Sequence, residues 1–169
     1  MKALTPQITK LPDRKIVTVS SVGDPNKVME PYMKALYGAV YSAKMKVYKP
    51  KGIKMELGKL TALWPDAHLK PKDQWKGIWG VPVPDYVSDK DLTQKDPDIA
   101  VKIDVWKGGE YAEILHLGPY TEEGPTVKKL HDFIEESGYK IIGTHEEEYL
   151  TKPDAKNMKT IIRYLVKKK

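Results

Sequence analysis

The chain has 169 residues, 40% of them hydrophobic, with no cysteine and a formal net charge of +6. The apolar content excludes a disordered chain, the lack of cysteine excludes disulfides and thiolate metal sites, and the absence of any apolar run of roughly 18 residues excludes a membrane span. Residues 1–15 lack the apolar core of a signal peptide, and the lysines are scattered rather than gathered in a patch, so we expect a soluble, cytoplasmic protein without membrane contact or specific nucleic-acid binding.

The first half of the chain predicts a strand, a helix and then more strands. The run Ile16, Val17, Thr18, Val19 favours a strand, which Gly-Asp-Pro-Asn ends. A helix follows in "KVMEPYMKALYGAVYSAKMK", where apolar residues recur at helical spacing. The segments "MELGKLTALWP" and "WKGIWGVPVPDYV" are strand material interrupted by prolines, a polar connector follows, and "IAVKIDVW" alternates as a strand does.

The second half repeats this order. "WKGG" is typical of a hairpin turn, a strand and a Gly-Pro break follow, and "TVKKLHDFIEESG" predicts a helix with Val127, Leu130 and Ile134 on its apolar side. Gly138 is a natural helix end. The segments "YKIIGTHEEEYL" and "MKTIIRYLV" predict two closing strands.

The two halves indicate an internal duplication. "VSSVGDPN" and "ILHLGPYT" both combine a strand with a glycine and a proline before a helix, and Gly23 and Gly118 occupy the same place in each. We therefore predict an α+β fold made of two strand-helix-strand-strand modules, about 14–90 and 99–167, within a single domain of residues 1–169. Antiparallel sheets related by a pseudo-two-fold axis would leave a central ligand groove where the modules meet.

Several segments resemble the GyrI-like small-molecule-binding family, and its stand-alone members in particular. They are "VGDPN", "ALYGAVYSAKMK", "HLGPYTEEGPT" and "EEEYLTKPDAKNMKTIIRYLV", and the resemblance runs from about Val17 to Val166. It implies a pseudo-symmetric pair of strand-helix-strand-strand modules that bind lipophilic, often cationic or planar compounds. Some members are effector domains of multidrug-responsive regulators, and some stand-alone members are similar to hydrolases that open strained cyclopropane rings.

The resemblance also implies site residues. The family's pocket glutamate stands two residues before a tyrosine, a pattern that falls on Glu147 and Tyr149. These two would bind the ligand, and they would be catalytic if the protein is an enzyme. Trp64 matches one of two consecutive tryptophans, with Pro65 in place of the second, and Leu165 stands where many members carry a proline.

Physical chemistry gives Glu147 two interpretations. If "EEEYL" is a strand, Glu147 and Tyr149 share one face, and Glu146 and Glu148 point to the other. An inward carboxylate is costly unless something pairs it, and a cationic ligand would do so. The alternative is a solvated edge strand with three exposed glutamates.

Other aromatic residues are candidate ligand contacts. The chain has 10 tyrosines and 4 tryptophans against one phenylalanine, and such rings serve both packed cores and ligand sites. The candidates are Trp64, Trp79, Trp106, Tyr37, Tyr41, Tyr111 and Tyr120. Core packing is the alternative for each. The four histidines lack metal-binding spacing, and no nucleotide or cofactor fingerprint is present, so we predict no metal and no cofactor.

The sequence therefore leaves two functions open. In the first, the protein binds lipophilic, aromatic or cationic small molecules for sequestration or sensing, alone, with a protein partner or as a homodimer. In the second, it is a hydrolase that opens strained rings of electrophilic xenobiotics, with Glu147 as acid or base. The residues alone do not separate the binder from the enzyme.

Overall fold

A computed structural model describes residues 1–169 and divides them into two compact units. The central unit is Arg14–Trp106, and the terminal unit combines Met1–Asp13 with Lys107–Lys169. No helix in either unit has the length and apolar character needed to cross a bilayer.

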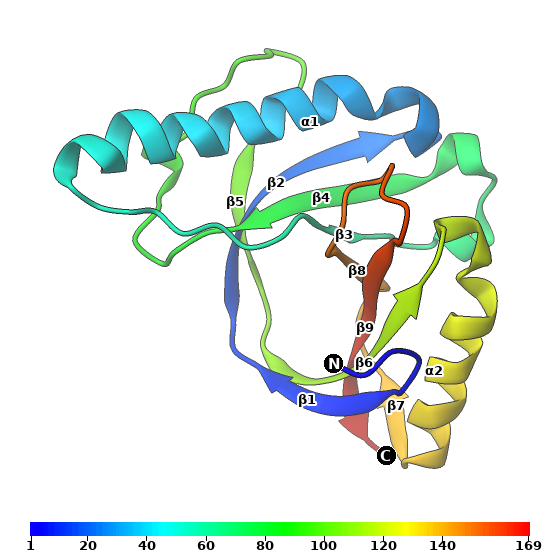
Figure 1. Cartoon of the computed structure of the whole chain (residues 1–169). Coiled ribbons are helices and arrows are strands. Elements are labelled where there is room, and N and C mark those ends of the chain that lie inside the picture. The colour runs from blue at the N-terminus through cyan, green and yellow to red at the C-terminus, as the bar shows by residue number, and fades with distance from the viewer. The chain divides into compact units, whose positions relative to one another are not determined.

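The central unit is an antiparallel sheet with one long helix along it (Figure 1). Its strands are β2 (Arg14–Val22), β3 (Thr61–Leu63), β4 (Lys76–Pro82) and β5 (Lys102–Trp106), in the order β3-β4-β2-β5. Helix α1 (Pro25–Ser42) contacts β2 and β4. The short helical segments are η1 (Ala43–Tyr48), η2 (Lys49–Lys51), η3 (Ala67–Leu69), η4 (Lys72–Gln74) and η5 (Asp89–Asp91).

Helix α1 begins and packs as its sequence dictates. The Asp24 side chain accepts a hydrogen bond from the backbone N–H of Asn26, which satisfies one of the free donors at the helix start. Its buried face is made of small and aliphatic side chains, namely Ala35, Leu36, Ala39 and Val40. Tyr41, for which core packing was the alternative to ligand contact, is 50% exposed.

The terminal unit repeats this arrangement. Its strands are β1 (Gln7–Leu11), β6 (Gly109–Leu117), β7 (Tyr139–Ile141), β8 (Glu146–Tyr149) and β9 (Lys159–Lys168), and its helices are η6 (Tyr120–Glu122) and α2 (Gly124–Glu136). β1 pairs with β6 and β6 with β9, while β7 and β8 both pair with β9, all antiparallel. Helix α2 lies beside β6 and β7 (Figure 1).

One face of this sheet forms a core with α2. Leu130 and Ile134 of the helix pack with alternate residues of the strands, including Ile114, Ile162 and Tyr164. Val127 is partly buried against the same cluster, so the predicted stripe of this helix is confirmed. Burying these apolar side chains is the main force that holds helix and sheet together.

The matching order of elements confirms the predicted α+β class with antiparallel sheets. In each unit a long strand leads through a glycine to a helix, and further strands follow. Gly23 has φ of 118° and Gly118 has φ of 119°, a backbone region that favours glycine, so both strand-to-helix corners need this residue.

Some local predictions are wrong. "WKGG" is not a hairpin, because β5 pairs with β2 and β6 pairs with β1. Gly108 is needed there for close approach, since a Cβ atom would lie 2.5 Å from the backbone oxygen of Leu11. The predicted strand "YKIIGTHEEEYL" is two strands, β7 and β8, and β1 was not predicted at all.

Candidate functional site

Strand β8 sends successive glutamates to opposite faces of the terminal unit's sheet. Glu146 lies opposite Arg163 of β9, and Glu147 lies opposite Ile162. Ile162 belongs to the core that α2 covers, so Glu147 and Tyr149 are on the helix side. Glu146 is 2% exposed and Glu147 is 7% exposed, so the alternative of three solvent-exposed glutamates is wrong.

A chain of hydrogen bonds runs through the carboxylate of Glu147. The Tyr149 hydroxyl donates to Oε1 at 2.9 Å, and Nε2 of His145 lies 2.7 Å from Oε2. On the other side of its ring, Nδ1 of His145 lies 2.7 Å from the hydroxyl of Tyr164. Both ring nitrogens of His145 are therefore engaged, which fixes the ring beside Glu147.

Glu123 brings a second carboxyl to the same place. It stands immediately before α2, and one of its carboxyl oxygens lies within 4.8 Å of ligand atoms of His145 and Glu147. Oε1 of Glu123 is buried and has no hydrogen-bond partner in the protein.

The two carboxyls differ in acidity because their surroundings differ. Burial, the charge of Glu147 and the hydrogen bond to it raise the pKa of Glu123 to about 10. Burial alone would raise the pKa of Glu147 as well, but hydrogen bonds from His145, Glu123 and Tyr149 outweigh it and lower that pKa. These surroundings therefore favour the protonated form of Glu123 and the ionised form of Glu147.

The opposite face of the sheet buries an arginine among carboxylates. Arg163 donates from Nε to Glu113 at 3.1 Å and from Nη1 to Glu146 at 2.9 Å and Glu148 at 3.1 Å. Gln7 of β1 also donates to Glu113, at 3.0 Å. Burial acts to lower the pKa of Arg163, but the three carboxylates outweigh it and raise that pKa. These contacts leave the guanidinium occupied, so we assign this face a structural role.

The donor atoms that could hold a metal are those of Glu123, His145 and Glu147. One ligand atom from each lies within 4.8 Å of the others. Two carboxylates and an imidazole are a chemically reasonable set for a divalent transition metal. Nε2 of His145 and Oε2 of Glu147 already contact each other, and Oε1 of Glu147 accepts from Tyr149, whereas Oε1 of Glu123 has no hydrogen-bond partner in the protein.

Of two other predicted ligand contacts in the terminal unit, Tyr120 lies in the Glu147 cluster and Tyr111 does not. The ring of Tyr120 packs edge-on against that of Tyr149, with centroids 5.6 Å apart, so it joins the Glu147 cluster. Burial, with the charges of Glu147 and Glu123, raises the pKa of Tyr120 to about 12. Tyr111 lies on the face opposite Glu147, and its hydroxyl donates to the backbone oxygen of Lys107 at 2.6 Å.

Two of the predicted tryptophans of the central unit, Trp64 and Trp79, form a cluster with Trp75. The ring centroid of Trp64 lies 5.0 Å from that of Trp79 and 5.9 Å from that of Trp75. Trp79 is 7% exposed, and its Nε1 donates to Ser21 at 3.1 Å. Trp64 is only partly buried, which leaves part of its ring accessible.

Because the two units repeat the same order of elements, residues of the tryptophan cluster have equivalents in the strands around Glu147. Val22 pairs with Lys76 in the central unit as Leu117 pairs with Lys159 in the terminal unit. Three residues further along, Trp79 of β4 is equivalent to Ile162 of β9. The strand partner of Trp79 is Ala62, whereas the strand partner of Ile162 is Glu147. The central unit thus has Ala62 in the place of the carboxylate and Trp64 in the place of Tyr149.

The remaining predicted residues lie elsewhere in the central unit. Tyr37 and Tyr41 stack on α1 with centroids 6.1 Å apart. Trp106 is buried at the end of β5, with the guanidinium of Arg14 5.7 Å from its ring centroid. These contacts connect neither Tyr37 and Tyr41 nor Trp106 and Arg14 to the tryptophan cluster.

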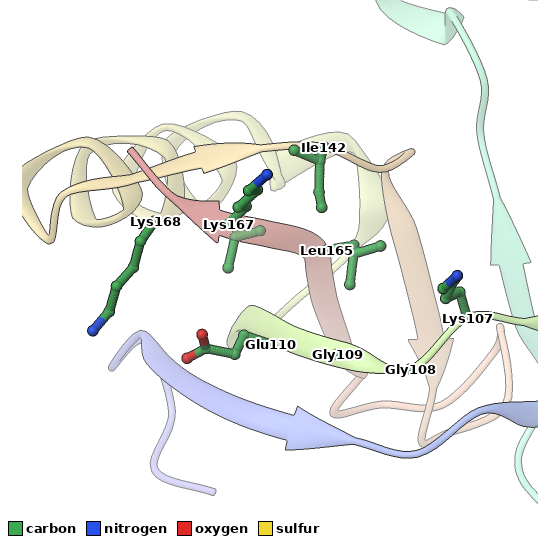
Figure 2. A pocket seen from close by; sticks show the side chains of 9 residues that line it. Lys107, Gly108, Gly109, Glu110, Ile142, Leu165, Lys167 and Lys168 are labelled. Atoms are coloured by element: carbon green, nitrogen blue, oxygen red, sulfur yellow. The ribbon is translucent and has the colours of Figure 1, made fainter.

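A surface hollow of about 530 Å³ lies in the terminal unit, apart from the Glu147 cluster. Figure 2 shows Ile142 and Leu165 near the backbone of Gly109, with lysine side chains and Glu110 around them. The hollow shares no residue with the Glu147 cluster and has no buried charge, so we do not assign the ligand site to it.

Sequence reasoning missed Glu123, His145 and Tyr164 as members of the cluster. His145 stands two residues before Glu147, so the period of a strand could have placed both on one face. Tyr164 alternates in the same way with Ile162 on β9. Glu123 gave no such signal, because only the packing of α2 on the sheet brings it to β8.

Comparison with known proteins agrees with this architecture. A family model described as the GyrI-like small molecule binding domain matches residues 4–166. Among curated proteins, none matches the chain.

Solved structures of similar fold cover almost the whole chain. An uncharacterised conserved protein from Listeria innocua is 27% identical with a TM-score of 0.84, covering 98% of this chain and 93% of its own. A protein from Listeria innocua described as a hydrolase is 25% identical with a TM-score of 0.80, covering 99% and 94%. The C-terminal domain of EcmrR is 15% identical with a TM-score of 0.70 and covers 98% of each chain, which shows a shared fold.

Proposed function

The chain belongs to the GyrI-like small-molecule-binding family, and we propose that it binds a lipophilic, aromatic cation through the buried carboxylate of Glu147. The observation that carries this proposal is a carboxylate 7% exposed, held in place by His145 and Tyr149, with aromatic rings around it. Because a buried carboxylate has lost most of its hydration, an organic cation would supply the electrostatic stabilisation that water no longer gives it. The faces of the tyrosine rings would add cation–π attraction.

The wider setting follows from the same proposal. The protein works in the cytoplasm without a cofactor, and it sequesters the compound or reports it to a protein partner or to a second copy of itself. Trp64 and Trp79 are proposed aromatic contacts, supported by the partial exposure of Trp64 and by its edge-to-face packing on Trp79.

Titration calorimetry with tetraphenylphosphonium tests the binding role. Glu147→Gln is expected to weaken binding by at least about tenfold, since each tenfold in affinity is about 1.4 kcal/mol and a buried charge interaction exceeds that. Glu148→Gln is the matched control, because it makes the same change one residue away on the opposite face. Equal affinity of Glu147→Gln and the unchanged protein would refute the role, as would equal binding of the neutral triphenylphosphine oxide.

A hydrolase is the second candidate, favoured by the two carboxyls of opposite protonation. Glu147 would accept a proton from water while the water oxygen bonds to a strained ring carbon. The ring carbon–carbon bond breaks, its electron pair moves to a conjugated carbonyl, and that oxygen takes up a proton, so the net change is addition of one water. Tyr149 would stabilise the developing oxyanion. The similar Listeria innocua protein described as a hydrolase supports this alternative.

Turnover distinguishes the two candidates. A cyclopropane-bearing alkylating compound is incubated with the protein, and the water adduct is measured by mass spectrometry. Product that disappears in Glu147→Gln and persists in Glu148→Gln favours the hydrolase. Saturable binding without conversion favours the binder.

A further inference from the structure

The surface hollow of the terminal unit lies in a fork of its sheet (Figure 2). The pairing of β6 with β9 ends where Tyr111 lies opposite Leu165. Beyond that pair, Gly109 and Glu110 pair with β1 alone, and residues 166–168 pair with β7 alone. The two branches therefore separate, and residues of both line the hollow of about 530 Å³. This volume lies within the usual range of small-ligand pockets.

Part of the lining is aliphatic. It includes Ile142, which is 51% exposed, and Leu165, which is partly buried. Gly109 keeps the space beside Leu165 open, because a Cβ atom added there would lie 3.1 Å from Cδ1 of Leu165. A ligand with an apolar body would remove this surface from water, which favours binding.

The lysines around the hollow lack an anionic partner. Lys107, Lys167 and Lys168 line it, and Lys140 lies opposite Lys167 in the pairing of β7 with β9. All four are exposed, and none takes part in a salt bridge, unlike other lysines of the unit. Like charges directly opposite each other in a sheet are destabilising, so an anion beside Lys140 and Lys167 would relieve their repulsion.

Glu110 does not supply the missing negative charge. It is the one acidic residue of the lining, against three lysines, which leaves a net charge of +2. Its Oε2 already accepts a hydrogen bond from the hydroxyl of Tyr139 at 2.9 Å. The hollow therefore combines an apolar surface with an excess of positive charge.

We propose that this hollow is a second ligand site, which binds small amphipathic anions with an apolar body and a carboxylate, sulfonate or phosphate group. The apolar body lies against Ile142 and Leu165, and the anionic group lies beside the lysines. The site does not depend on the proposed binding of a cation by Glu147, because the hollow shares no residue with the Glu147 cluster. One chain would then bind cations and anions at separate places.

The shape of the surface favours a small molecule over a bilayer. The apolar lining is recessed between the two branches of the sheet, whereas insertion among acyl chains requires an apolar face that projects from the protein. A single ligand that enters the recess can contact the aliphatic lining and the lysines together.

Calorimetry of the full chain with octanesulfonate tests the site. Octanol and octyltrimethylammonium carry the same aliphatic chain without charge and with a positive charge. We expect saturable binding of octanesulfonate, at least about tenfold tighter than that of octanol, because contacts with several lysines add to the apolar contact. Amide NMR signals of Gly109, Ile142 and Leu165 should shift with octanesulfonate and not with octyltrimethylammonium. Equal affinity for octanol, or shifts confined to other residues, would overturn the site.

A pair of charge-removing variants tests the lysines. Lys140→Gln combined with Lys167→Gln should weaken octanesulfonate binding by about tenfold and leave octanol binding unchanged. Lys152→Gln combined with Lys156→Gln is the matched control, because it removes two charges from exposed positions between β8 and β9. Equal losses in the two double variants would overturn the assignment, since they would show a general effect of net charge.

Two further measurements on the unchanged protein separate this site from its alternatives. Saturating tetraphenylphosphonium should not displace octanesulfonate, and displacement would overturn the separation of the two sites. Sedimentation with phosphatidylglycerol vesicles tests a bilayer as the source of the anionic group. Protein that sediments with the vesicles and does not bind octanesulfonate would overturn the small-molecule site in favour of a membrane surface.

Discussion

Glu146 and Glu147 are neighbours in β8, yet their carboxylates end on opposite faces of the sheet in opposite environments. Glu146 lies 2.9 Å from the guanidinium of Arg163, a permanent cation. Glu147 lies 2.7 Å from Nε2 of His145 and accepts from the Tyr149 hydroxyl, and neither group is a permanent cation. One carboxylate is thus neutralised by the fold, and the other is suited to a cation from outside.

Arg163 is expected to be a main determinant of stability. Arg163→Met leaves Glu113 and Glu146 buried without their cation, and breaking a buried ion pair from one side costs about 3–5 kcal/mol. Urea denaturation measures the change in the free energy of unfolding. Arg163→Lys keeps the positive charge but loses the planar guanidinium group, so its loss of stability should be smaller than that of Arg163→Met. A change under about 1 kcal/mol for Arg163→Met would show that the carboxylates find water or protons instead.

The Tyr149 hydroxyl is expected to hold the pKa of Glu147 down. Tyr149→Phe removes one hydrogen bond to the carboxylate while keeping the ring on Tyr120. Losing a hydrogen bond to the ionised form disfavours that form, so the pKa of Glu147 should rise in this variant. Carbon-detected NMR titration of labelled glutamate side chains measures it.

Tyr164→Phe is the control for that titration. Its hydroxyl contacts His145 rather than Glu147, so the pKa of Glu147 should move less than in Tyr149→Phe. Equal shifts in the two variants would mean that the hydrogen-bonded chain acts as a whole.

Glu123 makes the fold less stable as pH rises. Its pKa is raised from the ordinary 4.5 to about 10, so the folded state binds the proton more tightly than the unfolded state. The stability this gives is fully present below pH 4.5 and is lost progressively as pH rises toward 10. Glu123→Gln should therefore show a flatter dependence of Tm on pH than the unchanged protein.

Thermal scans at pH 6 and pH 9 measure this difference, with Glu122→Gln as the exposed control. We expect the Tm of Glu123→Gln, relative to that of the unchanged protein, to be several degrees higher at pH 9 than at pH 6. Parallel curves for the two proteins would contradict the raised pKa.

Trp64 is expected to contribute to aromatic ligand binding, whereas its neighbour Trp75 should contribute little. The indole N–H of Trp75 is held by the backbone oxygen of Lys70, at 3.0 Å, in an exposed loop. Trp64→Leu should weaken tetraphenylphosphonium binding by about tenfold, in line with an aromatic contact worth about 1–2 kcal/mol. Calorimetry of Trp64→Leu and Trp75→Leu compares them, and equal losses would point to packing within the cluster.

Metal removal is expected to leave ligand affinity unchanged. Nε2 of His145 lies 2.7 Å from Oε2 of Glu147 and Tyr149 donates to Oε1, so a metal would have to break these contacts. Dialysis against EDTA should not alter tetraphenylphosphonium affinity, and adding zinc should not raise Tm. A rise in Tm with zinc that is lost in His145→Ala would show that the three residues hold a metal.

Local patterns allowed much of the fold to be predicted. The helix of residues 124–136 showed its buried stripe directly, and two similar strand-to-helix corners revealed the duplication. The failures lay where pairing is non-local. "WKGG" has hairpin composition, but β5 and β6 pair with other strands, and "YKIIGTHEEEYL" is interrupted where a Cβ on Gly143 would lie 2.8 Å from the side chain of Leu165.

The sequence by itself determined that Glu146 and Glu147 would use opposite faces of β8, because side chains alternate along any strand whatever surrounds it. It also determined that the "EEEYL" segment would place Glu147 beside Tyr149. Only the tertiary structure decided what those side chains would meet. Arg163 reaches Glu146 through strand pairing, and Glu123 reaches Glu147 through the packing of α2 on the sheet. Charge neutralisation depends on distances of a few ångströms between segments far apart in the chain, and those distances exist only once the core has formed.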